Sequence, residues 1–192
     1  MAGRIILPGA VGYHTLQQGD LDDLCGLYAA INAICIVTAP VRPLSDRDVR
    51  RLMRAGVRDL DRRYVFRRAF SKGMKVKVQR KLTKHLVQQA SALTGIKLSA
   101  RKLRVDPTTS GQVQLIQAIE DSLNQGAAVV MGLQNMHDHF TVVVGASTAR
   151  LYLADSDGLY WLPKRHLGPC GGADCYRHAV CLKEIQKIAT SQ

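Results

Sequence analysis

Apolar residues in the first part of the chain recur at intervals of three and four, which is typical of amphipathic helices. One helix is predicted from the apolar face of residues 27–34. Two aspartates before it, a residue type favoured at N-caps, place its start at or just before Cys25. Ser45 and Asp48 resemble a capping box, which opens a second helix that Gly56 is predicted to close. Further helices are predicted over residues 83–93 and 111–124.

The pattern changes after residue 126 to short β-rich runs separated by turn-type residues. Helices followed by strands indicate an α+β fold. We expect a single domain over residues 1–192, with a helical layer packed against an antiparallel sheet. The stretch 58–81 is weakly periodic, and both a loop and a small hairpin remain open for it. The predicted strands are 127–133, 140–145, 150–154, 160–162 and 179–182.

Composition narrows the class of protein. The chain has 192 residues, 46% hydrophobic and 22% charged, which is ordinary for a globular domain. It contains no apolar run of the roughly 20 residues that cross a bilayer, so no membrane insertion is expected. The first residues lack the apolar core of a secretory signal, which predicts a protein that is cytoplasmic as synthesised. Any export or delivery into a target cell would then proceed without a cleaved signal peptide.

Positive charge is concentrated in one segment. Residues 42–104 hold 20 of the 27 lysines and arginines against four acids, and the net charge is +12. Such a block is either a solvated face or a surface for an acidic partner. Without interleaved aromatic residues, contacts to nucleic acid would be non-specific and directed at phosphates. The candidate partner-binding residues are Arg62, Arg63, Arg67, Arg68, Lys72, Lys75 and Lys77.

The five cysteines are odd in number and unevenly spaced, which argues against a disulfide framework and favours reduced thiols. Cys25 differs from the others in its predicted place at a helix N-terminus, where a thiolate is stabilised. The alternative for any single cysteine is a buried, inert thiol such as Cys35.

The segment around Cys25 resembles the nucleophile segment of papain-like cysteine peptidases, and most closely the bacterial branch that includes bacteriocin leader peptidases. Residues 17–33 read Gln-Gln-Gly-Asp-Leu-Asp-Asp-Leu-Cys-Gly-Leu-Tyr-Ala-Ala-Ile-Asn-Ala. Residues 139–145, His-Phe-Thr-Val-Val-Val-Gly, resemble the histidine strand of the family. Residues 153–158, Leu-Ala-Asp-Ser-Asp-Gly, resemble the strand end that supplies the third residue of its triad. The order Cys, His, Asp is also that of the family.

The resemblance implies a papain-like fold, no cofactor and a Cys-His-Asp triad. Cys25 would be the nucleophile, His139 its base and Asp155 the residue that orients the imidazole. The oxyanion hole would combine the backbone N–H of Cys25 with a glutamine side chain. The commoner spacing falls on Gly19, so Gln18 is preferred on the tolerance of loops to insertions, with Gln17 as the alternative.

Alternatives at the same residues stay open. Asp157 could orient the histidine in place of Asp155. His137 and His139 could bind a metal, but no further ligand cluster accompanies them. A zinc site near the C-terminus is less consistent with its loose cysteine spacing, and no metal is expected. Its candidate ligands are His166, Cys170, Cys175 and His178.

Three functions follow. The first is a cysteine peptidase that acts through an acyl-enzyme on a protein or peptide substrate. Its compact form and basic face suit a bacterial effector or toxin, in which case the producing cell is expected to hold an inhibitor protein. The second is a deamidase or acyltransferase with the same triad. The third is a non-enzymatic basic module that binds nucleic acid or an acidic protein.

Overall fold

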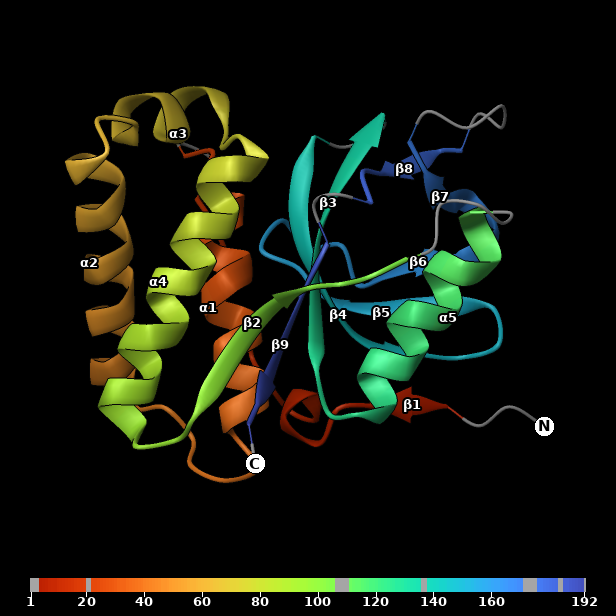
Figure 1. Cartoon of the computed structure of the whole chain (residues 1–192), viewed down its shortest axis with the longest axis horizontal. Coiled ribbons are helices and arrows are strands. Elements are labelled where there is room, and N and C mark those ends of the chain that lie inside the picture. Colours follow the sequence, from red (N-terminus) through yellow and green to blue (C-terminus); the bar gives the residue numbers. More distant parts are fainter. Residues whose placement is uncertain are drawn as a thin grey trace.

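The computed structural model describes residues 4–19, 22–105, 111–135, 138–170, 176–182 and 185–191. Within them the chain forms an α+β fold, as predicted (Figure 1). The helices are α1 (Cys25–Thr38), α2 (Asp46–Arg62), α3 (Phe66–Lys72), α4 (Val76–Thr94) and α5 (Gly111–Asn124). The strands are β1 (Ile5–Ile6), β2 (Leu98–Lys102), β3 (Ala128–Asn135), β4 (His139–Ala146), β5 (Arg150–Ala154), β6 (Trp161–Pro163), β7 (Leu167–Pro169), β8 (His178–Val180) and β9 (Gln186–Thr190).

The strands form one open sheet in the order β2-β9-β3-β4-β5-β6. Short strands extend it, because β1 pairs with β4, and β8 pairs with both β3 and β7. Every pair is antiparallel except β7 with β8, which run parallel. The antiparallel sheet predicted from the sequence is therefore present with one parallel pair at its edge.

Helices cover both faces of this sheet (Figure 1). On one side α1 packs against β3, β4 and β9, with α2 and α4 outside it, and on the other side α5 packs against β3, β4 and β7. Every residue of α1 except Tyr28 is buried, since the helix has neighbours all round. The prediction of a single apolar face over residues 27–34 was too narrow, because Gly26, Ala29 and Ala33 also pack inside.

The helical layer differs from the prediction in two places. Gly56 lies inside α2 and does not close it. A Cβ at this position would lie 2.4 Å from Cδ1 of Leu27, so the glycine allows α2 to approach α1 closely. The stretch 58–81 is neither a loop nor a hairpin, since it contains the end of α2, all of α3 and the start of α4. Helix α4 begins at Val76, seven residues before its predicted start.

The Ser45–Asp48 capping box is present, with both reciprocal bonds. Helix α5 has its predicted bounds, and the five predicted strands correspond to β3, β4, β5, β6 and β8 within a few residues. Strands β1, β2, β7 and β9 were not predicted. No helix among the described residues is both long and apolar enough to cross a membrane.

Candidate active site

Cys25 is the first residue of α1, as predicted, and only 5% of its surface is exposed. The N-cap is Leu24, which makes no side-chain cap bond, so the predicted aspartate cap is wrong. Asp22 stabilises the turn before the helix and does not cap the helix itself. Its carboxylate accepts the backbone N–H of Leu24 at 3.0 Å and that of Gly19 at 3.3 Å, which closes the turn leading into the helix. Among the described residues, none accepts the backbone N–H of Cys25.

Strand β4 brings the imidazole and a backbone donor to this cysteine. His139 opens the strand, and the N–H of the next residue, Phe140, donates to Cys25 Sγ at 3.4 Å. The thiol therefore touches the strand that carries the histidine, although 114 residues separate Cys25 from His139 along the chain.

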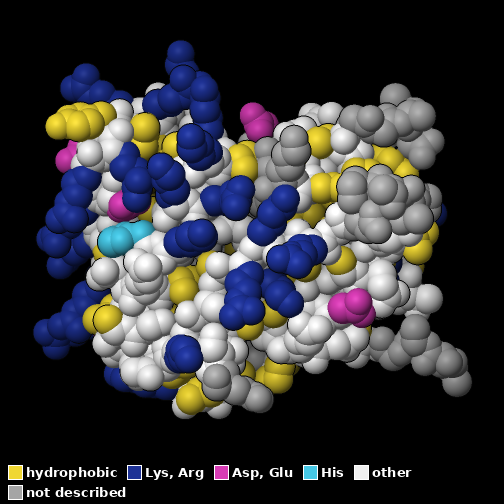
Figure 2. Space-filling view, viewed as in Figure 1, with side chains coloured by type: hydrophobic (Ala, Val, Ile, Leu, Met, Phe, Trp, Pro, Cys, Tyr) yellow, Lys and Arg dark blue, Asp and Glu magenta, His cyan; other side chains and the backbone are white. Residues whose placement is uncertain are grey.

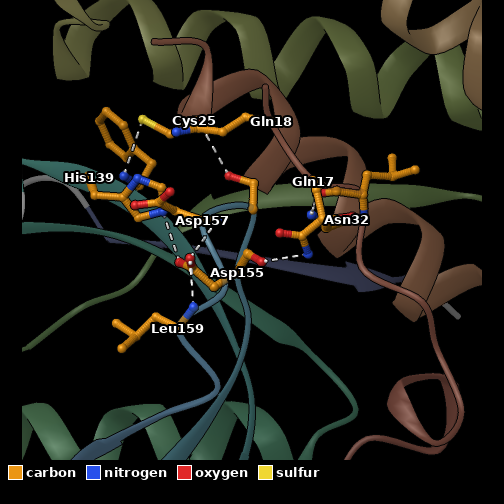
Figure 3. Close-up of polar contacts among 11 residues, drawn as sticks. Gln17, Gln18, Cys25, Asn32, His139, Asp155, Asp157 and Leu159 are labelled. Atoms are coloured by element: carbon orange, nitrogen blue, oxygen red, sulfur yellow. Dashed lines mark hydrogen bonds and ion pairs between the residues drawn. The ribbon is translucent and has the colours of Figure 1, made fainter. Parts of the chain in front are cut away.

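Asp155 follows directly after β5 and lies on the far side of the imidazole (Figure 3). Its Oδ2 is 2.9 Å from Nε2 of His139, and its Oδ1 accepts the backbone N–H groups of Asp157 and Leu159. Gly158, at φ +80°, allows the tight turn that aims these donors at the carboxylate. Asp155 and not Asp157 therefore contacts the histidine, and the Asp157 side chain lines the adjacent cavity.

The two ionisable groups stabilise each other's charge. Burial lowers the pKa of His139, but its hydrogen bonds and charge interactions with Asp155 and Cys25 outweigh burial and raise that pKa to about 10. Burial raises the pKa of Asp155, but the bond from His139, followed by its charge, leaves the pKa below its ordinary value. Both shifts favour the charged imidazolium–carboxylate pair. With Nε2 engaged by Asp155, Nδ1 is the ring nitrogen that can exchange a proton with Cys25.

The two glutamines differ in what their side chains do. The Gln17 amide donates to the carbonyl oxygens of Thr15 and Asp155, both at 3.3 Å. Gln18 is fixed instead through Ser156, whose carbonyl accepts its backbone N–H at 2.9 Å and whose hydroxyl donates to its Oε1 at 3.4 Å. Gln18 lines the same cavity as Cys25 and His139, and Gln17 is not among that cavity's lining residues.

Asn32 is a residue of this site that sequence reasoning missed. It is fully buried on α1, where its Oδ1 accepts the N–H of Leu16 at 2.9 Å and the hydroxyl of Tyr13 at 2.8 Å. Its Nδ2 donates back to the Leu16 carbonyl at 3.2 Å. Asn32 thus fixes the segment that leads into the two glutamines (Figure 3). The available signal was a lone polar residue in the apolar helix predicted around residues 27–34.

Two cavities meet at Cys25 and His139, with volumes of about 250 Å³ and about 400 Å³. The smaller one, called here the α3–α4 cavity, lies against the junction of those helices and is also lined by Arg68, Lys75 and Met74. The larger one, called here the loop cavity, is also lined by Gln18, Asp23 and Asp157. Lys72, Gly73 and Asp138 line both. Together they form a cleft that passes the thiol on both sides.

The predicted partner-binding residues separate into different surroundings. Arg62 and Arg63 lie at the C-terminal end of α2, where Arg63 forms a bidentate ion pair with Asp59. Only three of the seven line the cleft beside Cys25. These are Arg68, Lys72 and Lys75, whereas Arg67 and Lys77 are exposed outside it.

A second basic region lies apart from the cleft. A hollow of about 760 Å³ between α4, β2, β9 and α5 is lined by six cations and one acid, Asp121. None of the six takes part in an ion pair with another described residue. Lysines and arginines gather over α4, β2 and β9 on the face in Figure 2. This basic groove is lined by Arg80, Lys84, Arg101, Lys102, Arg104 and Lys187.

Metal alternatives receive no support from the described part of the chain. His137 and Cys175, candidate ligands in the sequence, lie outside the described residues. Among those that are described, no group of three histidine, cysteine, aspartate or glutamate side chains is arranged to hold a metal ion. The ring of His166 instead accepts a bond from Arg165 at 3.2 Å.

Comparisons with known proteins identify the fold through structure alone. No family model matches the sequence, and no curated protein matches it. Among solved structures, the chain is similar to a candidate C39-like peptidase from Bacillus anthracis. The match has a TM-score of 0.50 and 12% sequence identity, and it covers 99% of this chain and 98% of the other. At that identity the similarity shows a shared fold over the whole chain.

Proposed function

We propose that this protein is a papain-like cysteine peptidase with Cys25 as nucleophile, His139 as general base and acid, and Asp155 as the orienting carboxylate. The observation that carries the proposal is the placement of His139 between the other two residues. Its Nε2 bonds to Asp155 at 2.9 Å, and its other face is turned to a thiol at the N-terminus of a buried helix. The fold shared with a candidate C39-like peptidase supports the same activity.

The chemistry proceeds through a thioester. The Cys25 thiolate attacks the scissile carbonyl carbon, and the resulting oxyanion is bound by the N–H of Cys25 and the side-chain amide of Gln18. The imidazolium of His139 gives its Nδ1 proton to the leaving amine as the C–N bond breaks. A water molecule, deprotonated by His139, then attacks the thioester and releases the carboxylic acid and the free thiol.

The oxyanion role belongs to Gln18 in this proposal because its side chain reaches the cavity of Cys25. Its Oε1 is taken by the Ser156 hydroxyl, which turns the amide nitrogen toward the open side. Gln17 is proposed as a clamp that ties the segment to the carbonyl of Asp155.

Cavities of about 250 and 400 Å³ beside a buried thiol suit one extended segment of a particular partner better than general protein degradation. We therefore retain the hypothesis of an effector that acts on a specific protein, accompanied by an inhibitor protein in the producing cell. Deamidation and acyl transfer use the same thioester and differ in the group that leaves or the group that attacks. Mass spectrometry of a modified partner separates them, since cleavage yields two fragments, deamidation adds about one dalton and acyl transfer joins two molecules.

The direct test is the rate of alkylation by iodoacetamide, mapped to individual cysteines, in wild type and His139→Ala. An activated pair predicts selective labelling of Cys25 at neutral pH that the substitution abolishes. Two internal references are present. Cys170 is an exposed reference thiol, and burial raises the pKa of Cys35 to about 11, so that thiol stays protonated. Labelling of Cys25 no faster than Cys170, and unchanged by the substitution, would sink the proposal.

A second role is proposed for the basic groove, which is contact with the phosphates of nucleic acid. Protein–protein interfaces have an apolar core, whereas nucleic-acid interfaces are much more positively charged. None of the exposed large apolar residues lines the groove, which contains six cations. Without aromatic side chains for stacking, such binding would not depend on base sequence.

A further inference from the structure

The cleft on either side of Cys25 is divided by charge. The α3–α4 cavity has two cations of its own, Arg68 and Lys75, and no acid that the loop cavity does not share. The loop cavity has two acids of its own, Asp23 and Asp157, and no cation that the α3–α4 cavity does not share. Lys72 and Asp138 stand where the two meet. The charged residues that line the cleft therefore change from mainly basic to mainly acidic across the thiol.

The cations of the α3–α4 cavity have no ion-pair partner among the described residues. No described acid forms an ion pair with Arg68, Lys72 or Lys75. All three side chains are exposed, so they reach the cavity rim while their charges remain accessible. Three cations without a described ion-pair partner surround a hollow of about 250 Å³, and a bound anion would relieve their mutual repulsion.

A backbone hydrogen bond fixes the helix that carries Arg68 relative to the segment that carries Cys25. The N–H of Asp23, two residues before Cys25, donates to the carbonyl of Phe70 in α3 at 2.9 Å. Buried Met74 packs between α3 and α4 and lines the same cavity. Arg68 and Lys75 are thus placed on elements fixed to the segment that carries the thiol.

We infer that the α3–α4 cavity is a subsite for an acidic residue, so that the substrate carries an aspartate or glutamate beside the bond that is attacked. The inference rests on the proposed role of Cys25 and adds the chemical class of the substrate. A carboxylate in this subsite meets Arg68 and Lys75, and guanidinium groups bind carboxylates through paired N–H donors. At the other end of the cleft, Asp23 and Asp157 favour a neutral or basic residue.

The charge of the subsite can be measured before any substrate is known, by comparing two alkylating agents. Iodoacetate and iodoacetamide form the same bond to sulfur, but only iodoacetate carries a carboxylate. Their rate ratio at Cys25 cancels changes in thiol activation and reports the local potential. We expect the ratio at Cys25 to exceed that at Cys170 by about tenfold at low salt and to fall as salt is added.

The decisive variant is Arg68→Glu/Lys75→Glu, and its matched control is Arg47→Glu/Arg50→Glu. The control changes the net charge equally at two exposed α2 positions that do not line the cleft. The subsite variant should lower the Cys25 rate ratio to that of Cys170 or below it, while the control keeps at least half of the wild-type ratio. Circular dichroism verifies that both variants are folded.

A positional peptide library then tests substrate preference by mass spectrometry. Wild type should favour Asp or Glu on one side of the cleaved bond, and the subsite variant should favour Lys or Arg there. Equal rate ratios in wild type and the subsite variant would overturn the inference even if Cys25 is rapidly labelled by iodoacetamide. Slow labelling by both agents would instead refute the proposed nucleophile, so the two failures are distinguishable.

Discussion

The side chain of Asn32 bonds to both backbone groups of Leu16, accepting its N–H at 2.9 Å and donating to its carbonyl at 3.2 Å. A buried amide that satisfies one distant residue on both sides fixes the position and rotation of that segment. Gln17 and Gln18 follow immediately, so the rigid helix α1 positions both its own first residue, Cys25, and the proposed oxyanion donor. The Asn32 side chain thus links α1 to the segment that precedes the loop between Gln18 and Cys25.

Asn32→Leu should lower the free energy of unfolding by at least about 2 kcal/mol, because the Leu16 peptide and the Tyr13 hydroxyl lose their partners. Tyr13→Phe removes only one of these bonds and should cost about 1 kcal/mol. Urea denaturation of both variants tests the order. An equal loss of unfolding free energy in Asn32→Leu and Tyr13→Phe would show that the two Asn32–Leu16 hydrogen bonds contribute nothing to stability.

Gln18→Ala should slow formation of the thioester by about 10²–10³, the usual effect of losing one oxyanion donor. Alkylation by iodoacetamide creates no oxyanion, so its rate at Cys25 should change little. Gln17→Ala is the matched control and should retain most of the acylation rate, since that side chain bonds to backbone carbonyls. A larger defect in Gln17→Ala would reassign the oxyanion donor. The readout is single-turnover acylation by an activated ester.

The His139–Asp155 pair predicts how stability depends on pH. The pKa of His139 is raised from its ordinary value of 6.5 to about 10. Its charged form therefore stabilises the fold fully below pH 6.5, and this contribution is lost as pH rises toward 10. The pKa of Asp155 is lowered from 3.8, so its contribution is present above that pH and lost as pH falls through the lowered value.

In Asp155→Asn the histidine loses its charged partner, so its pKa should move down, and the alkaline loss of stability should be smaller and end at a lower pH than in wild type. Nuclear magnetic resonance titration of the His139 ring gives the pKa directly, and unfolding free energies between pH 5 and about pH 10 give the linkage. An unchanged ring titration in the variant would mean that Asp155 does not stabilise the imidazolium.

The basic groove predicts salt-dependent binding of single-stranded DNA and RNA of any sequence. Arg101→Glu/Arg104→Glu should weaken it at low salt and reduce the slope of log K against log salt by about one for each phosphate that the variant no longer binds. Arg47→Glu/Arg50→Glu, off the groove, should have less effect. Fluorescence anisotropy measures both. Absence of saturable oligonucleotide binding at low salt would refute the proposed contact with phosphates.

Much of the site could be predicted because it depends on local order along the chain. The start of α1 at Cys25, the strand opening at His139 and the strand end before Asp155 all follow from patterns within a few residues. The preference for Asp155 over Asp157 also agrees with the contact to His139, since the last apolar residues of β5 aim its carboxylate inward. The catalytic roles of these residues stay predictions until they are tested.

Other features depend on partners far away in sequence, which a local pattern does not reveal. Gly56 resembles a helix end, yet it is retained inside α2 because Leu27 of another helix needs the space. Residues 186–190, Gln-Lys-Ile-Ala-Thr, show no alternation of polar and apolar residues, and only pairing with β2 and β3 makes them a strand. Asn32 matters because of residues 13–16, which no periodicity links to it.

The position of β9 has a consequence for how the protein is made. Residues 186–190 form β9 between β2 and β3, so the strand that hydrogen-bonds to both is absent until that segment has left the ribosome. Cys25 and His139 are both synthesised before β9, which is the strand that joins β2 to the rest of the sheet. The full layer of strands against which α1 packs therefore forms only after both residues of the proposed catalytic pair have been translated.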